Sequence, residues 1–447
     1  MNKNITYLLL IILFLGGVGF IIYKGGRNKD QVAFYQLQDR KGPLAFAPEW
    51  ASTQVNVQKL YRSMENDPSD KKSPLNLATI FIQEARITGN YSYYDMAAMR
   101  QVDKVLALDA NNFQALTYKS LIYLSQHHFA EGLDIANQAR QLNPYNSFIY
   151  GILVDANVEM GNYADAVSNA EKMISIKPDL RSYSRISYLR EIHGDYPGAI
   201  AVMKMAVQAG VNGDDGTEWT RVQLGHLFEN TGALDTAEFE YQQALEFRKG
   251  FAPALAGLGH IAFARKDYNK AMVYYQQADT LVMDYTNKEN LAELYRLTGQ
   301  VKRSDSLSAL VITNMSKDAS TADNGENNIG HYVDRELAYA YLAVGKNEQG
   351  LEHALAEYNR RPNNIDVNQT LAWAYYKNAD FGKASKYMDV ALRTNCKNPT
   401  LLCYAGLIYS KAGDKKKGKL LLSQALLKDP AIDIALKTES ITALKNL

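Results

Sequence analysis

Hydrophobic and polar positions follow each other along most of the chain with the three-to-four-residue spacing of amphipathic helices. Prolines interrupt this pattern at a regular interval, because the spacing from Pro362 to Pro430 is twice the spacing from Pro144 to Pro178. A fixed period of about 34 residues indicates a repeated structural unit. Proline cannot continue a helix, so it marks where each unit ends.

The unit that ends at Pro430 shows how each repeat is built. Small Gly406 is followed three residues later by Tyr409, then by Gly413 at a turn and by a second small residue, Gly418. Small residues let two helices approach closely, and the aromatic ring fills the space beside them. We therefore expect two helices per unit, the first of them ended by a C-cap glycine. These expected glycines are Gly161, Gly194, Gly232, Gly299, Gly345 and Gly413.

The pattern occurs about ten times and resembles the tetratricopeptide repeat (TPR) family over most of residues 70–430. The resemblance implies an all-α, right-handed superhelical solenoid, in which stacked helix-turn-helix repeats bury a continuous core. The first helices are expected to start near Lys71, Phe113, Ser147, Leu180, Glu218, Ala252, Tyr285, His331, Ile365 and Pro399.

Longer runs, such as RSYSRISYLREIHGDYPGAI (181–200) and LAWAYYKNADFGKASKYMDVAL (371–392), look like a widespread, mostly uncharacterised group of exported bacterial TPR proteins. That likeness implies export across the inner membrane and no known chemistry. The segments expected along the chain are a membrane anchor or signal (1–26), a stalk (27–49), a leading helix (50–70), repeats one to seven (71–314), a flexible loop (315–330), repeats eight to ten (331–430) and a capping helix (431–447).

The N-terminus carries the strongest targeting signal. Ile5–Tyr23 is uncharged and long enough to span a bilayer. An uncleaved single-pass anchor in the inner membrane is the favoured interpretation, with the repeats in the periplasm. A cleaved signal ending near Gly19, with a soluble periplasmic product, is the alternative. Positive charges on both sides, Lys3 before and Lys24 after the span, leave orientation open, so a cytoplasm-facing anchored adaptor is a third possibility.

Composition and motifs give no sign of catalysis. The net charge is +1, which does not favour nucleic acid as a partner. The two cysteines, Cys396 and Cys403, are too few for a disulfide framework or a zinc knuckle. GLGHIA (257–262) and GDKKKGKL (413–420) resemble nucleotide-binding loops, but both place their glycines where the repeat requires small residues or a turn. No cofactor and no metal site are expected, and the chain is interpreted as a non-enzyme.

The candidate binding surface is the concave side of the solenoid. Helical spacing places positions two, five, nine and twelve of each first helix on one stripe. Reading off these positions gives Arg181, Tyr188, Glu191, Trp219, His226, Glu229, His260, Tyr332, Arg335, Tyr339, Trp373 and Tyr376. Aromatic and arginine side chains are frequent in binding hot spots, and such a groove suits an extended peptide or a partner helix. The competing interpretation is that many of these rings only pack between helices.

The sequence therefore favours a non-catalytic protein-binding scaffold at the cell envelope. An envelope-biogenesis accessory factor that binds a glycan or small molecule is the alternative, because aromatic rings stack on sugars as well as on peptides.

Overall fold

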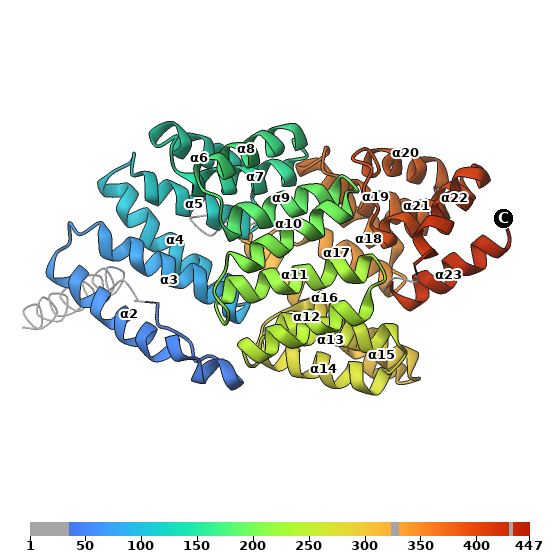
Figure 1. Ribbon diagram of the computed structural model, residues 1–447, viewed down its shortest axis with the longest axis horizontal. Helices are drawn as coiled ribbons and strands as arrows, with labels where there is room; N and C mark the ends of the chain where they lie inside the picture. Colours follow the sequence, from blue (N-terminus) through green and yellow to red (C-terminus); the bar gives the residue numbers. More distant parts are fainter. Residues whose placement is uncertain (1–34, 323–329, 429–431) are drawn as a thin grey trace, which may run out of the picture. The chain divides into compact units, whose positions relative to one another are not determined.

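Helices follow one another as antiparallel pairs from Lys72 onward (Figure 1). The computed structural model describes residues 35–322, 330–428 and 432–447, and residues 40–447 form one compact unit. Ten helix pairs lie within the described residues, and we number them as repeats one to ten. The expected helical repeat array is confirmed.

A short 3-10 helix, η1 (Gly42–Phe46), and a lone helix, α2 (Pro48–Asn66), precede the pairs. The ten pairs are α3 (Lys72–Thr88) with α4 (Tyr91–Leu108), α5 (Phe113–Ser125) with α6 (Phe129–Leu142), α7 (Ser147–Met160) with α8 (Tyr163–Ile176), α9 (Leu180–Ile192) with α10 (Tyr196–Gln208), α11 (Asp215–Asn230) with α12 (Leu234–Phe247), α13 (Ala252–Ala264) with α14 (Tyr268–Leu281), α15 (Tyr285–Leu297) with α16 (Val301–Ala322), α17 (Asp334–Ala343) with α18 (Asn347–Arg360), α19 (Ile365–Lys377) with α20 (Phe381–Ala391), and α21 (Pro399–Lys411) with α22 (Lys415–Leu426). The final helix is α23 (Ile434–Lys445).

Packing inside each pair follows the small-residue and aromatic pattern of the sequence. A Cβ added at Gly406 would lie 2.5 Å from the Leu422 side chain of its partner helix. Gly225 and Gly257 both lie against the ring of Tyr241, which is fully buried. Bringing two helices this close removes apolar surface from water, so these glycines allow the core to form despite their low helix propensity.

The prediction of a flexible loop at 315–330 is wrong for the first half of this segment, because α16 continues to Ala322. Val311 and Met315 are buried with Val333 and Leu337, and Ala319 packs against the same cluster. These positions extend an apolar helical face four residues at a time, which outweighs the polar residues between them.

The expected stalk at 27–49 is also wrong from residue 40 onward. Arg40 is 4% exposed, and its guanidinium donates hydrogen bonds to Glu84 of α3, at 2.7 and 3.0 Å, and to Glu49, at 2.9 Å. Leu44 of η1 is buried as well. A buried arginine requires paired carboxylates, and the sequence spacing between Arg40 and Glu84 gave no sign of the pairing.

None of the helices in the described part of the chain has the length and apolar character needed to cross a membrane. The expected span Ile5–Tyr23 lies outside the described residues.

The glycines expected to end first helices do so in the left-handed conformation, with φ between 76° and 100° from Gly161 to Gly413. Their surroundings divide them into two groups. A Cβ at Gly299, Gly345 or Gly413 would meet nothing within 4 Å. A Cβ at Gly161, by contrast, would lie well inside the van der Waals distance of the Asn363 carbonyl oxygen. Gly194 meets the Asn395 carbonyl and Gly232 the Lys428 carbonyl in the same way.

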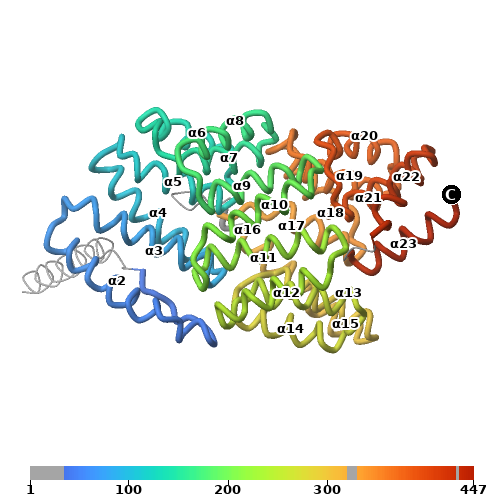
Figure 2. Tube along the Cα trace, viewed as in Figure 1, coloured from blue at the N-terminus to red at the C-terminus, as the bar shows by residue number. Residues whose placement is uncertain are grey.

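These close approaches join segments that are far apart along the chain. We call this set of contacts the seam. The turn after the first helix of repeats one to four touches the loop that precedes the first helix six repeats later. The turn of repeat five touches Lys428, which precedes the final helix α23. At the start of the seam, Met283 donates its backbone N–H to the Thr88 carbonyl at 2.9 Å. The superhelix therefore makes one turn in six repeats, and the chain between α18 and α19 returns to lie beside the end of α7 and the start of α8 (Figure 2).

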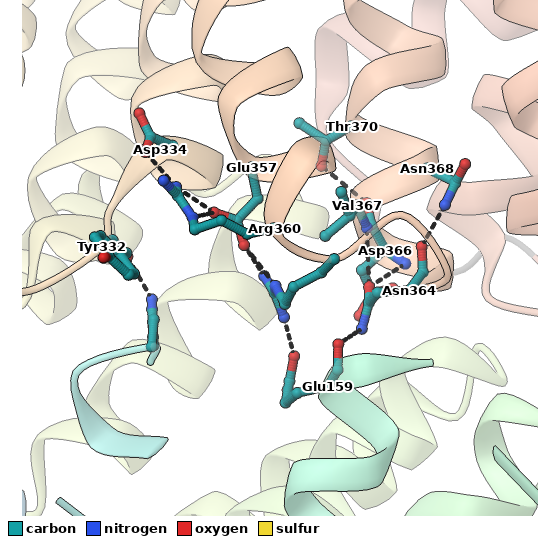
Figure 3. A network of polar contacts seen from close by, with 12 residues as sticks. Glu159, Tyr332, Asp334, Glu357, Arg360, Asn364, Asp366, Val367, Asn368 and Thr370 are labelled. Atoms are coloured by element: carbon teal, nitrogen blue, oxygen red, sulfur yellow. Dashed lines mark hydrogen bonds and ion pairs between the residues drawn. The ribbon is translucent and has the colours of Figure 1, made fainter. Parts of the chain in front are cut away.

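Polar side chains reinforce the middle of the seam (Figure 3). Asn364 donates its amide to the carbonyls of Val158 and Glu159, at 3.2 and 3.0 Å. Arg361 forms ion pairs with Glu159 across the seam and with Glu357 on its own helix. The Tyr163 hydroxyl accepts a hydrogen bond from the Ile365 backbone N–H at 2.9 Å. Several independent donors thus hold repeat three against repeat nine.

Two histidines meet at the same seam between repeats two and eight. The nearest ring nitrogens of His127 and His331 are 3.3 Å apart, and the other contact of His127 Nδ1 is the Tyr332 carbonyl at 2.7 Å. Burial lowers the pKa of His127 to about 4 and that of His331 to about 3. Both rings are therefore neutral at neutral pH, and charging both would place two like charges in contact.

We expect Gly161→Ala to destabilise the array more than Gly345→Ala does. Both substitutions force alanine into the left-handed region, which costs about 1–2 kcal/mol. Only Gly161→Ala also drives a Cβ into the backbone of Asn363, which adds about 1–3 kcal/mol of overpacking. Urea denaturation followed by circular dichroism measures the difference, and equal losses for the two variants would contradict the seam.

Acidification should weaken the seam at the histidine pair. The pKa values of both histidines in the folded chain lie below the unfolded value of 6.5. The stability that the neutral pair contributes is therefore fully present above pH 6.5 and is lost as pH falls towards 4. His331→Asn should make the melting temperature less sensitive to pH over this window than it is in the unmodified chain. His193→Asn is the matched control, and the idea fails if both variants show the same pH dependence.

Candidate binding groove

The inner stripe of the solenoid is formed by consecutive first helices, and side-chain hydrogen bonds link several neighbouring pairs of them. Arg185 of α9 binds Asp155 of α7 with a bidentate pair at 2.6 and 2.9 Å. Asn230 of α11 donates to Glu191 of α9 at 3.2 Å. Gln369 of α19 donates to the Tyr339 hydroxyl of α17 at 3.2 Å. These bonds fix side-chain rotamers before any partner binds, which lowers the entropic cost of binding.

Two of the expected aromatic contacts are open to solvent. Tyr188 on α9 is 39% exposed, and Trp219 on α11 is 41% exposed. Burial nevertheless raises the pKa of the Tyr188 hydroxyl well above its usual value. Arg181 is also exposed, and its guanidinium lies 5.1 Å above the Phe148 ring.

Charged groups of the stripe have shifted proton affinities. Burial raises the pKa of Glu191 to about 7. Arg335 of α17 is half-buried, and although burial lowers its pKa, the carboxylate of Asp366 and its neighbours raise it overall. Within the described residues, the Arg335 Nε atom is buried without a hydrogen-bond partner. An unpaired guanidinium N–H is costly, and an acceptor supplied by a ligand would remove that cost.

Other expected contacts pack within the protein. Trp373 is 7% exposed and stacks on Tyr376 and Tyr404, with ring centroids 4.8 and 4.2 Å away. Tyr332 lies at the seam between His128 and the Arg360 guanidinium. For these side chains the structure agrees with the competing interpretation, that the rings fill space between helices.

Three expected residues come together at one point of the stripe. Glu229 of α11 is 6% exposed, and its carboxylate lies 3.6 Å from His226 Nδ1 and 3.8 Å from His260 Nδ1 of α13. Burial alone would raise the pKa of Glu229, but the two imidazoles lower it to about 2. The carboxylate is therefore charged, and its negative charge raises the pKa of His260 against the effect of burial.

The sequence did not reveal the groups that surround this cluster. The Tyr241 hydroxyl donates to Glu229 at 2.7 Å and lies 2.9 Å from His226 Nδ1. A cavity of about 200 Å³ adjoins the cluster, and Asn290, Glu293 and Asp433 are among the residues that line it. Burial and the neighbouring Asp433 carboxyl raise the pKa of Glu293 to about 9, so Glu293 is protonated at neutral pH.

The C-terminal segment supplies one wall of that cavity. Helix α23 packs on α21 and α22, as expected of a cap, but it also reaches helices of earlier repeats. Tyr376 of α19 donates its hydroxyl to Glu439 at 2.8 Å, and Ile434 contacts the core between α13 and α15. The cap therefore lies across part of the inner stripe, which repeat periodicity alone cannot show.

The nucleotide-loop look-alikes serve the repeat geometry. Gly257 and Gly259 lie inside α13 against Tyr241 and Tyr275, and Gly418 lies inside α22. Both cysteines are buried free thiols. The repeat geometry explains the glycines of both loops, and packing in the core explains the two cysteines.

Comparison with known proteins agrees with this architecture. Residues 252–281, which contain α13 and α14, match the family described as tetratricopeptide repeat. No curated protein matches the chain. The helix-pair geometry and this match define an all-α protein built from TPR-like helical repeats.

The solved structures that match the chain share little sequence with it. A tetratricopeptide repeat protein from Parabacteroides merdae is 15% identical, covers 54% of this chain and 91% of its own, and has a TM-score of 0.43. PilW, a type IV pilus biogenesis factor, is 13% identical with 48% and 96% coverage and a TM-score of 0.38. Human IFIT1, solved as a dimer with PPP-AAAA, is 16% identical with 77% and 79% coverage and a TM-score of 0.46.

Proposed function

We propose that this chain is a non-catalytic scaffold of the bacterial cell envelope, which holds a peptide or helix of a protein partner in its inner groove. The observation that carries the proposal is the pair of solvent-exposed rings, Tyr188 and Trp219, on neighbouring first helices. Large exposed aromatic side chains on a rigid support are typical anchors of protein interfaces. Ile5–Tyr23 would tether the scaffold to the inner membrane, with the repeats in the periplasm.

The region around these rings suits a peptide better than a flat protein surface. Glu191 and Arg181 lie on the same helix as Tyr188, so charged and aromatic contacts alternate along α9. The cross-helix bonds of Arg185 and Asn230 hold this region in place. Arg335, farther along the stripe, offers its unpaired Nε to a carbonyl or carboxylate of the bound segment.

A photo-crosslinking amino acid at position 219 should capture the partner in intact cells. The same amino acid at Phe239 is the matched control, because Phe239 is a 55% exposed aromatic residue on a second helix. Mass spectrometry of the adducts identifies the partner. Equal capture at both positions would argue against binding in the groove.

With the partner in hand, the double variant Tyr188→Ala and Trp219→Ala should weaken its affinity by about 30-fold or more, as loss of an aromatic hot spot of about 2 kcal/mol requires. Phe239→Ala should leave the affinity unchanged. Isothermal titration calorimetry measures both. An unchanged affinity of the double variant would overturn the assignment of the groove.

The membrane tether has its own test. Deleting residues 1–26 should release the chain from membranes, and a C-terminal alkaline phosphatase fusion to the full chain should be active, because that enzyme requires the oxidising periplasm. An inactive phosphatase fusion beside a fluorescent cytoplasmic reporter fusion would place the repeats in the cytoplasm instead.

A further inference from the structure

The cluster of Glu229, His226 and His260 has the composition of a metal site. Two imidazoles and one carboxylate are the set that binds zinc in many enzymes, where a fourth position remains open. One ligand atom from each of the three residues lies within 4.8 Å of the others. We propose that these three side chains bind a divalent transition-metal ion of the zinc class.

Two of the three distances between ligand atoms are near those of a tetrahedral site. Zinc–ligand bonds of about 2.0–2.2 Å place neighbouring ligand atoms of a tetrahedral site about 3.4 Å apart. The Glu229 oxygen lies 3.6 Å from His226 Nδ1 and 3.8 Å from His260 Nδ1. Small side-chain rotations could shorten these distances to about 3.4 Å, because both imidazoles are about one-third exposed. The backbone of α11 and α13 need not move.

Groups around the three ligands are placed to orient them. Tyr241 donates its hydroxyl to Oε1 of Glu229, whereas Oε2 is the oxygen measured against the two imidazoles. The same hydroxyl lies 2.9 Å from His226 Nδ1, a contact that a metal on that nitrogen would replace. The Asn290 amide nitrogen lies 3.4 Å from His260 Nε2, the ring nitrogen that the metal would not use. With the metal on Nδ1, Nε2 carries the proton, so the Asn290 amide would accept it through its oxygen after exchanging the positions of its oxygen and nitrogen. Hydrogen bonds to the second carboxylate oxygen and to the second imidazole nitrogen are the usual outer contacts of a metal site, because they fix the ligand orientation.

Glu229 and His260 line the 200 Å³ cavity, which offers space for a fourth ligand beside them. Glu293 and Asp433 line this cavity, and within the described residues one oxygen of Glu293, Oε1, is buried without a hydrogen-bond partner. A water molecule on the metal could donate to that oxygen. Two imidazole ligands favour zinc or a similar transition metal over calcium or magnesium, which prefer sets made only of oxygen ligands.

The competing role for the cluster is purely structural. Glu229 would then be a buried anion stabilised by Tyr241 and by protonated imidazoles, with no metal involved. Metal titration separates the two roles. The full chain is purified in detergent without a polyhistidine tag, stripped of metal by a chelator, and titrated with Zn²⁺ against a chromophoric competitor. We expect saturable binding of one Zn²⁺ per chain, and Co²⁺ should give the visible absorption bands of a tetrahedral site.

Loss of an outer contact of a metal site weakens metal binding by roughly 10–100-fold, and Tyr241→Phe should weaken Zn²⁺ binding within that range. Glu229→Gln and His226→Ala each remove a ligand, so each should weaken Zn²⁺ binding by more than that. His331→Asn is the matched control, because His331 and His127 are a close histidine pair elsewhere in the chain. It should leave the affinity unchanged. Circular dichroism confirms that each variant is folded, and the conservative Glu229→Gln keeps the test valid if His226→Ala does not fold.

Three results would overturn the proposal. One is Zn²⁺ binding that does not saturate at one ion per chain. Another is equal Zn²⁺ affinity in the unmodified chain and in Glu229→Gln, which would leave Glu229 as a structural anion. The third is a preference for Ca²⁺ over Zn²⁺, which would move the ion to the carboxyl groups of Glu293 and Asp433.

Discussion

Contact between backbones at the seam is the constraint on which the rest of the structure depends. A turn glycine with positive φ has no Cβ, so the carbonyl of a loop six repeats later can lie directly against it. Gly161 against Asn363 and Gly194 against Asn395 repeat this geometry, and Arg361 and Asn364 strengthen it with side chains. In a solenoid, each repeat otherwise touches only its neighbours. The seam adds contacts between distant repeats and fixes the superhelical pitch.

A fixed pitch decides which inner side chains remain available. Closing the turn in six repeats brings the C-terminal segment beside α13 and α15, where Asp433 meets Glu293. It also leaves Tyr332 between His128 and Arg360 instead of in an open groove. Among the aromatic contacts expected on the inner stripe, the exposed rings are then those of Tyr188 on α9 and Trp219 on α11. The proposed partner site is thus a consequence of where the solenoid closes.

The sequence predicted what depends on neighbouring residues and missed what depends on distant ones. The structure agrees with seven of the expected starts of first helices, because caps and apolar periodicity act within one repeat. These starts are Phe113, Ser147, Leu180, Ala252, Tyr285, Ile365 and Pro399. The burial of Arg40 against Glu84 and the pair of Glu159 with Arg361 join residues 44 and 202 positions apart. Superhelical pitch accumulates from small rotations at every repeat, so no single sequence pattern specifies those contacts.

The cluster of Glu229, His226 and His260, the proposed metal site, lies between these two cases. His226 and His260 are separated by one repeat period, so the period alone places them at the same position of neighbouring first helices. Glu229 follows His226 by three residues, which puts it on the same face of α11. Their proximity was therefore readable from the sequence once the period was known, although a search for ligands spaced within a single helix could not find it. What the period could not supply is the Tyr241 hydroxyl beneath Glu229 and the Asp433 wall across the cavity. Without those two groups, the sequence shows only three neighbouring polar residues. With them, the three residues form an oriented set of ligands.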